Sequence, residues 1–308
     1  MVVTTYGIVA TSHVQASQAG AQILARGGSA IDAAIAANAV LGVTEPMMNG
    51  IGGDLFAIYW DAKAGKLYGL NSSGWAPQGL TVDRLKSKGV TKMPHEGIES
   101  VTVPGAVAGW NALHHRFGKL PWKDLFAPAL FYAQNGYPVP ELISSYWEEA
   151  PEIFAHDPEG QRVYLPNGKP PALGAIFRNS DLAKSLRLIA DTGPTAFYKG
   201  QIAQAILATS QALNGSMKNG IPALSRIHCN LSASPTLHTW RIVYSLRSSS
   251  YVGSGGGISG IGGGSSLTSL STVSPRFWSS CASACWAKSV NSDCCRPSAS
   301  NSPSVSCR

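Results

Sequence analysis

The stretch Gly27-Gly28-Ser29-Ala30-Ile31-Asp32-Ala33-Ala34 ends one predicted helix and begins the next. Residues 13–26 before it place apolar side chains on one face, and a Gly-Gly pair is a typical helix stop. Ser29, followed three residues later by Asp32, resembles a capping box, in which two side chains satisfy backbone N–H groups at a helix start. The alanine-rich helix predicted over 30–43 is apolar nearly all round, so we expect it to be buried.

Downstream of this helix pair, strand and helix patterns are mixed. A glycine-rich loop at 49–54 is followed by apolar runs at 55–60 and 66–70, and the turn over 61–65 between these runs predicts a β-hairpin. The other predicted elements are short strands at 7–11 and 100–103 and helices at 106–115, 122–135, 180–190 and 200–213. The mixture is typical of a layered α/β (α+β) domain.

Charge divides the chain into two segments. The 308 residues carry 24 Lys and Arg, 17 Asp and Glu and a net charge of +7. Residues 1–215 hold 16 basic and 16 acidic residues, whereas residues 216–308 hold 8 basic residues and one acidic residue, Asp293. The second segment also contains all six cysteines and a glycine- and serine-rich stretch at 253–266. We therefore predict one domain over 1–215 and a disordered, low-complexity tail over 216–308.

Several classes of function are disfavoured by these patterns. Because the basic excess lies entirely in the tail, it does not indicate a nucleic-acid partner. No apolar run reaches the roughly 18 residues of a membrane span, and no signal peptide is visible, so the default location is cytoplasmic. The tail's Cys294-Cys295 pair is poorly spaced for one tetrahedral metal site, and we predict no bound metal.

Four segments together resemble the large-subunit portion of the gamma-glutamyltranspeptidase (glutathione hydrolase) family. They are Gly7-Ile8-Val9-Ala10-Thr11-Ser12-His13 with residues 27–34; Asn49-Gly50-Ile51-Gly52-Gly53; Val103-Pro104-Gly105 with residues 108–110 and 117–122; and Ala196-Phe197-Tyr198-Lys199-Gly200 with its flanks. Each is weak alone, but their order and intervals are specific, and the resemblance covers residues 6–217.

The resemblance implies an N-terminal-nucleophile hydrolase fold, an αββα sandwich of which this chain holds an incomplete half. The family cleaves γ-glutamyl amides such as glutathione and passes the γ-glutamyl group to water, an amino acid or a peptide. The nucleophile is the N-terminal threonine that self-cleavage of a precursor exposes, with its own α-amine as the base. The resemblance implies no cofactor. It implies as partner the small subunit, whose strands complete the sandwich.

The catalytic motif of that small subunit is absent from this sequence. The threonine normally stands in a Thr-Thr-His stretch, but the one Thr-Thr pair here is Thr4-Thr5, and no Thr-His pair occurs. We therefore assign no catalytic residue and predict that the chain is inactive alone. Whether the chain is an enzyme in its own right stays open at this stage.

Ser73 is the one candidate substrate-binding residue. The family commonly carries an arginine four residues before the proline of an Ala-Pro pair, where it would clamp the substrate α-carboxylate. Here that pair is Ala76-Pro77 and the matching position is Ser73. Three alternatives follow: a γ-glutamyl substrate read differently, an acylase-like amide hydrolase of the same superfamily, or a non-catalytic binding or scaffold protein.

The resemblance stops near Met217, where the composition also changes. This coincidence suggests a frameshift, with the tail an out-of-frame translation of the missing part. The start of the chain lies almost on the first predicted strand, so a leader could also have been lost, since family members are often periplasmic or secreted.

Overall fold

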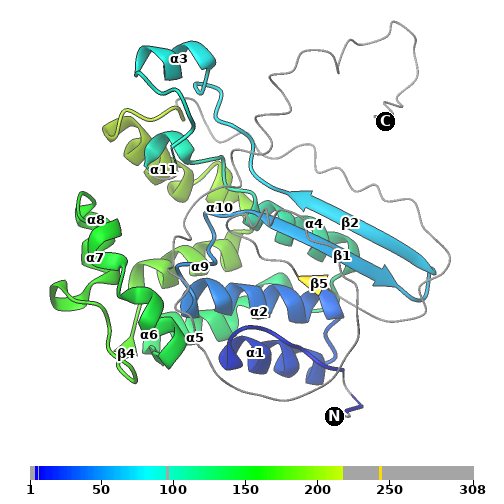
Figure 1. The fold of residues 1–308 in the computed structure, drawn as a ribbon. Helices are drawn as coiled ribbons and strands as arrows, with labels where there is room; N and C mark the ends of the chain where they lie inside the picture. The colour runs from blue at the N-terminus through cyan, green and yellow to red at the C-terminus, as the bar shows by residue number, and fades with distance from the viewer. Residues whose placement is uncertain (1–3, 6, 95–96, 218–242, 245–308) are drawn as a thin grey trace, which may run out of the picture.

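The computed structural model describes residues 4–5, 7–94, 97–217 and 243–244 (Figure 1). Its elements are α1 (Val14–Ala25), α2 (Ala30–Thr44), β1 (Leu55–Asp61), β2 (Lys66–Ser72), α3 (Val82–Ser87), η1 (Ile98–Ser100), α4 (Ala106–Phe117), η2 (Trp122–Phe126), α5 (Ala127–Asn135), β3 (Tyr137–Pro138), α6 (Glu141–Trp147), α7 (Ala150–Ile153), α8 (Pro158–Tyr164), η3 (Pro166–Gly168), β4 (Ile176–Phe177), α9 (Ser180–Thr192), α10 (Pro194–Tyr198), α11 (Gln201–Ala212) and β5 (Val243–Tyr244). The strands form two small sheets, in the orders β2-β1-β5 and β3-β4.

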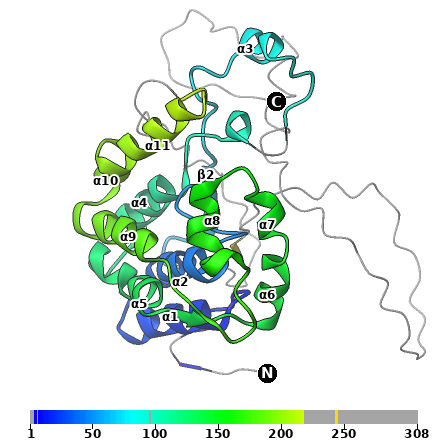
Figure 2. The same ribbon diagram turned by 90° about the vertical axis from the view of Figure 1, so that its left-hand side faces the viewer.

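Helix α2 is the centre of the fold. The predicted capping box is confirmed: the Ser29 hydroxyl accepts the Asp32 N–H, and the Asp32 carboxylate accepts the Ser29 N–H. All of α2 except Ala30 and Gly42 is buried. The helix contacts α1, α4 and α5 (Figure 1). Figure 2 shows α9, α10 and α11 following one another on one side of it, α6 and α7 on the other, and α8 in front of it.

The predicted hairpin is also confirmed. Strands β1 and β2 pair antiparallel from Leu55↔Ser72 at the open end to Asp61↔Lys66 at the turn. Leu55 and Ala57 are buried on the face that packs against α4, whereas Ile58, on the opposite face, is 45% exposed. This alternation is the period-2 burial of a sheet covered on one side.

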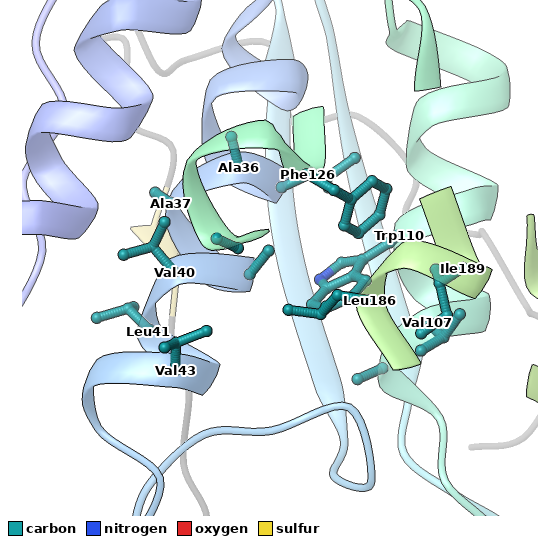
Figure 3. Close-up of a cluster of buried hydrophobic side chains, with 14 of the residues drawn as sticks. Ala36, Ala37, Val40, Leu41, Val43, Val107, Trp110, Phe126, Leu186 and Ile189 are labelled. Atoms are coloured by element: carbon teal, nitrogen blue, oxygen red, sulfur yellow. The ribbon is translucent and has the colours of Figure 1, made fainter. Parts of the chain in front are cut away.

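A buried cluster joins α2, α4, η2 and α9 (Figure 3). Trp110 of α4 lies at its centre, with its ring 5.8 Å from that of Phe126. The indole N–H donates to the Asn38 side-chain oxygen of α2 at 2.7 Å, and both residues are buried. Trp110 therefore contributes both packing and the one hydrogen bond that its polar atom needs.

Replacing Trp110 with phenylalanine is expected to lower the free energy of unfolding by about 2 kcal/mol, because Asn38 then keeps a buried oxygen without its donor. Urea unfolding followed by circular dichroism measures this loss. Trp75→Phe is the matched control, since Trp75 is 55% exposed; the control is expected to change the free energy by less than about 0.5 kcal/mol. Equal effects of the two substitutions would contradict the role given to the Trp110–Asn38 bond.

Three predicted elements were wrong in detail. Residues 7–11 and 100–103 are not strands: among the described residues neither segment is hydrogen-bonded into a sheet, and Ile8 is 62% exposed. The helix predicted over 122–135 is two elements, η2 and α5. Pro128 lies in the first turn of α5, the position where a helix tolerates a residue without an N–H.

Most of the predicted tail, 216–308, lies outside the described residues. Within it the structure describes residues 216–217 and the two-residue strand β5, which pairs antiparallel with β1 at Ala57 and Ile58. The division into a domain over 1–215 and a disordered tail therefore stays a prediction.

Candidate functional site

Three segments that are distant in sequence meet at the open end of the β1–β2 hairpin. They are the glycine loop (residues 49–54), the end of β2 with its continuation (72–76), and the loop before α4 (101–105); together we call them the hairpin junction. Gly53 accepts the N–H groups of Gly105 and Ala106, each at 2.9 Å, and Val103 donates its N–H to the Trp75 carbonyl at 2.9 Å. Backbone hydrogen bonds thus hold all three segments together.

Two glycines allow the segments to approach this closely. A Cβ on Gly74 would lie 1.6 Å from the Val103 carbonyl oxygen, and a Cβ on Gly105 would lie 1.9 Å from the Ser72 carbonyl oxygen. Both contacts are with backbone, which cannot rotate away as a side chain can. Close backbone approach, rather than phosphate binding, explains glycine at these positions.

The structure places Ser73, the candidate substrate-binding residue, inside the hairpin junction and leaves it partly exposed. Its N–H and its hydroxyl both donate to the side-chain oxygen of Asn71, at 2.9 and 2.8 Å. A hydroxyl carries one hydrogen, so this Ser73 rotamer offers a ligand only acceptor lone pairs. In this arrangement Ser73 does not present a donor to a carboxylate.

Asp54 lies beside Ser73 and was not singled out from the sequence. Its carboxylate accepts the Gly74 N–H at 2.9 Å. Burial raises the pKa of Asp54, and the hydrogen bond from Gly74 opposes that rise. Extending the hairpin register by one residue beyond Leu55↔Ser72 puts Asp54 opposite Ser73. The hairpin predicted from the sequence was therefore enough to indicate that Asp54 lies near Ser73.

Asp54 brings an acidic side chain to the hairpin junction, whereas a residue that clamps a carboxylate is basic. In the part of the chain that the structure describes, no Lys or Arg forms an ion pair with Asp54. A half-buried carboxylate without a cation repels a second carboxylate placed next to it. Among the described residues, the side chain next to Ser73 at the hairpin junction is thus an acidic one without a paired cation.

A second polar centre is Asp32, which joins two of the sequence segments that carry the resemblance. Besides the Ser29 N–H, its Oδ2 accepts the N–H groups of Lys119 at 2.9 Å and Leu120 at 3.1 Å. Nε2 of His114 is hydrogen-bonded to the Leu120 carbonyl at 2.8 Å. Asp32 is fully buried, so its role is to position the loop after α4 rather than to contact substrate.

The described residues contain neither a metal-binding cluster nor a helix that could span a membrane. Within them, no group of three His, Cys, Asp or Glu side chains is placed to hold a metal ion. All six cysteines fall outside the described ranges, so the prediction made for them is untested. Among the described helices, none combines the length and the hydropathy that crossing a bilayer requires.

Comparison with known proteins gives one consistent result. The family model for gamma-glutamyltranspeptidase matches residues 16–220. The chain is 41% identical over 218 residues to the glutathione hydrolase-like YwrD proenzyme of Bacillus subtilis, covering 70% of this chain and 41% of that protein. It is 38% identical over 221 residues to the acylase ACY 1 proenzyme of Pseudomonas sp. (strain V22), covering 68% of this chain and 39% of that one.

Solved structures agree with the sequence matches. The cephalosporin acylase from Bacillus halodurans superposes with a TM-score of 0.68 at 38% identity, over 74% of this chain and 45% of that chain. The gamma-glutamyltranspeptidase of Helicobacter pylori superposes with a TM-score of 0.70 at 28% identity, over 80% and 72% of the two chains.

These matches confirm the predicted fold class, a partial αββα sandwich of the N-terminal-nucleophile hydrolase type. The chain spans about two fifths of the length of the two curated relatives. The family model extends over about two thirds of the chain, including Asp32 and the hairpin junction, and identities of 38% to 41% to the two relatives cover a similar share of it. The chain belongs to the gamma-glutamyltranspeptidase family.

Proposed function

We propose that this chain supplies the large-subunit part of an amide hydrolase or acyltransferase that acts on γ-glutamyl amides or related N-acyl amides. The observation that carries the proposal is the hairpin junction, which brings Ser73, predicted to match the family's substrate-binding arginine, beside Asp54. The names of the relatives, glutathione hydrolases and acylases, support amide cleavage as the reaction class.

The nucleophile of the proposed reaction comes from outside these 308 residues. An N-terminal threonine attacks the amide carbonyl through its hydroxyl, while its α-amine takes the proton. The resulting acyl-enzyme transfers its acyl group to water or to an amine. No residue of this sequence stands in a Thr-Thr-His stretch, so the proposal gives the chain no part as nucleophile. Its contribution is to orient the acyl group at the hairpin junction.

An acylase that accepts amides without an α-carboxylate is the second candidate, and Ser73 favours it. In place of a guanidinium, this position carries a hydroxyl that already donates to Asn71. The adjacent Asp54 carboxylate adds repulsion toward an anionic group. Both features weaken binding of a glutamyl carboxylate and leave binding of a neutral acyl chain unaffected.

A chimeric protein distinguishes the two candidate functions by the amide that each prefers. Residues 7–217 of this chain replace the matching part of the YwrD proenzyme of Bacillus subtilis, and a gel shows whether the chimera cleaves itself. The cleaved chimera is then assayed on γ-glutamyl-p-nitroanilide and on butanoyl-p-nitroanilide. The proposal predicts turnover of at least one of these amides. Because position 73 is a serine and not an arginine, we expect butanoyl-p-nitroanilide, the neutral compound, to be preferred.

Ser73→Arg in the chimera is expected to raise kcat/KM for γ-glutamyl-p-nitroanilide by roughly ten- to a hundredfold, the worth of a charge-assisted bidentate contact. Ser73→Lys is the control and is expected to gain less, since an ammonium lacks the planar fork. A chimera that cleaves itself and hydrolyses neither amide would contradict the proposed function. An unchanged glutamyl rate in Ser73→Arg would contradict the role given to position 73.

A further inference from the structure

Trp75 is a large apolar side chain that the core does not use. It lies two residues beyond Ser73 in the hairpin junction and is 55% exposed. Trp110, Trp122 and Trp147 each donate their indole N–H to an oxygen of another element, whereas among the described residues Trp75 has no such acceptor and no ring contact. An exposed indole offers a wide apolar surface, which is why tryptophan is enriched where proteins bind other molecules.

The backbone around this indole is held in place. The Trp75 carbonyl accepts the Val103 N–H at 2.9 Å, and the Gly74 N–H donates to the Asp54 carboxylate at 2.9 Å. Gly74 also packs directly against the Val103 carbonyl, with no room for a side chain between them. The Trp75 indole is therefore exposed while its backbone is fixed, so a ligand that packs against it does not have to order a loop.

Alternation along the chain puts Trp75 on the same face as Ser73. In extended backbone, successive side chains point to opposite faces. The Asn71 and Ser73 side chains are hydrogen-bonded to each other and so share one face. On the other face, the Ser72 hydroxyl donates to a carbonyl of the loop before α4 at 2.8 Å, and the Cβ position of Gly74 is directed to that same loop. The next side chain, Trp75, therefore returns to the face of Ser73.

The spacing of these two residues relates the indole to the length of an acyl group. In the proposed function, position 73 takes the end of a γ-glutamyl group that is remote from the cleaved amide. A butanoyl chain ends where a γ-glutamyl group carries its α-carbon, and so ends near Ser73. The Cα of Trp75 lies about 7 Å further along, at roughly 3.3 Å for each residue of extended chain. Acyl chains longer than butanoyl are therefore the ones that reach the indole.

We propose that Trp75 is a specificity-determining residue that binds the apolar end of an acyl chain longer than butanoyl. The inference rests on the proposed function, to which it adds a substrate class: N-acyl amides with a straight, uncharged alkyl tail. Contact with the indole removes alkyl surface from water, and the gain in free energy grows with the apolar area buried. An uncharged tail also avoids repulsion by the Asp54 carboxylate next to Ser73.

Ligand binding to the full chain tests the proposal without catalysis. Hexanamide and butanamide are titrated separately while the indole N–H signals are followed by proton–nitrogen NMR. The Trp75 signal, identified by its loss in Trp75→Phe, is expected to shift saturably, at roughly four- to fifteenfold lower concentrations of hexanamide, because each buried CH₂ adds up to about fourfold in affinity. The signal of Trp110, which is 3% exposed, is the internal reference and is expected not to shift. A Trp75 signal that does not move, or moves equally with both amides, would overturn the proposal.

The self-cleaved chimera provides the kinetic test. Trp75→Ala is expected to lower kcat/KM for hexanoyl-p-nitroanilide by roughly four- to fifteenfold and to change the value for butanoyl-p-nitroanilide by less than about twofold. Phe131→Ala is the matched control, since it removes another exposed aromatic side chain, 58% exposed on α5, and is expected to leave both values unchanged. An unchanged ratio of the two values in Trp75→Ala would overturn the inference even while turnover supports the proposed function. If the chimera hydrolyses neither amide, the proposed function fails, and binding to the full chain still decides the role of Trp75.

Discussion

Replacing Asp32 with alanine is expected to lower the free energy of unfolding by about 3 to 6 kcal/mol. Three buried or partly buried backbone N–H groups, those of Ser29, Lys119 and Leu120, donate to its Oδ2. Each donor left without an acceptor costs about 1–3 kcal/mol. Since domains are stable by about 5–15 kcal/mol, the substitution removes much of the stability. Urea unfolding followed by circular dichroism measures the loss.

Asp124→Ala is the matched control for Asp32→Ala. Asp124 also carries a carboxylate with a close partner, Arg26 at 2.8 Å, but both side chains are largely exposed, at 39% and 51%. An exposed ion pair contributes less than about 1 kcal/mol. If Asp32→Ala costs no more than Asp124→Ala, Asp32 does not hold the start of α2 and the loop after α4 together in the way described.

Gly74→Ala is expected to be nearly as damaging, with a loss of about 3 kcal/mol or more. Its new methyl carbon would lie 1.6 Å from the Val103 carbonyl oxygen, so one of the two backbone segments must move. Overpacking of this kind costs roughly 1–3 kcal/mol and occasionally more, and here no flexible side chain is available to yield. Urea unfolding reports the loss, and faster hydrogen exchange at Val103 locates it.

Gly52→Ala, in the neighbouring glycine loop, is the control for Gly74→Ala. No atom lies within 4 Å of the Cβ that this substitution would add. The expected change is within about 0.5 kcal/mol, as for other exposed positions. Equal losses from the two substitutions would mean that the hairpin junction does not depend on close backbone approach.

Local patterns in the sequence were sufficient to predict α1, α2, α4, α9, α11 and the hairpin, but not the short helices α3, α6, α7, α8 and α10. The capping box at Ser29 and Asp32 and the turn between β1 and β2 depend on residues a few positions apart, so the sequence states them directly. The strands predicted at 7–11 and 100–103 failed for the opposite reason. An apolar run becomes a strand only where a neighbouring edge accepts its hydrogen bonds, and that neighbour is distant in sequence.

The candidate site was predicted only in part, for a related reason. Matching the Ala76-Pro77 pair made Ser73 a candidate, and its role in substrate binding stays a prediction. The sequence does not show that the Ser73 hydroxyl is turned toward Asn71. The long-range partner of Asp32, at Leu120, is likewise set by tertiary packing. Asp54 could have been found, because the hairpin register places it opposite Ser73.

We propose that this chain forms the acyl-orienting part of an amide hydrolase whose threonine nucleophile lies outside these 308 residues. The most direct test is the release of p-nitroaniline from γ-glutamyl-p-nitroanilide and butanoyl-p-nitroanilide by the purified chain alone. We expect a rate equal to that of buffer for both compounds, because the 308 residues contain no Thr-Thr-His stretch. Saturable turnover of either amide by the chain alone would contradict it.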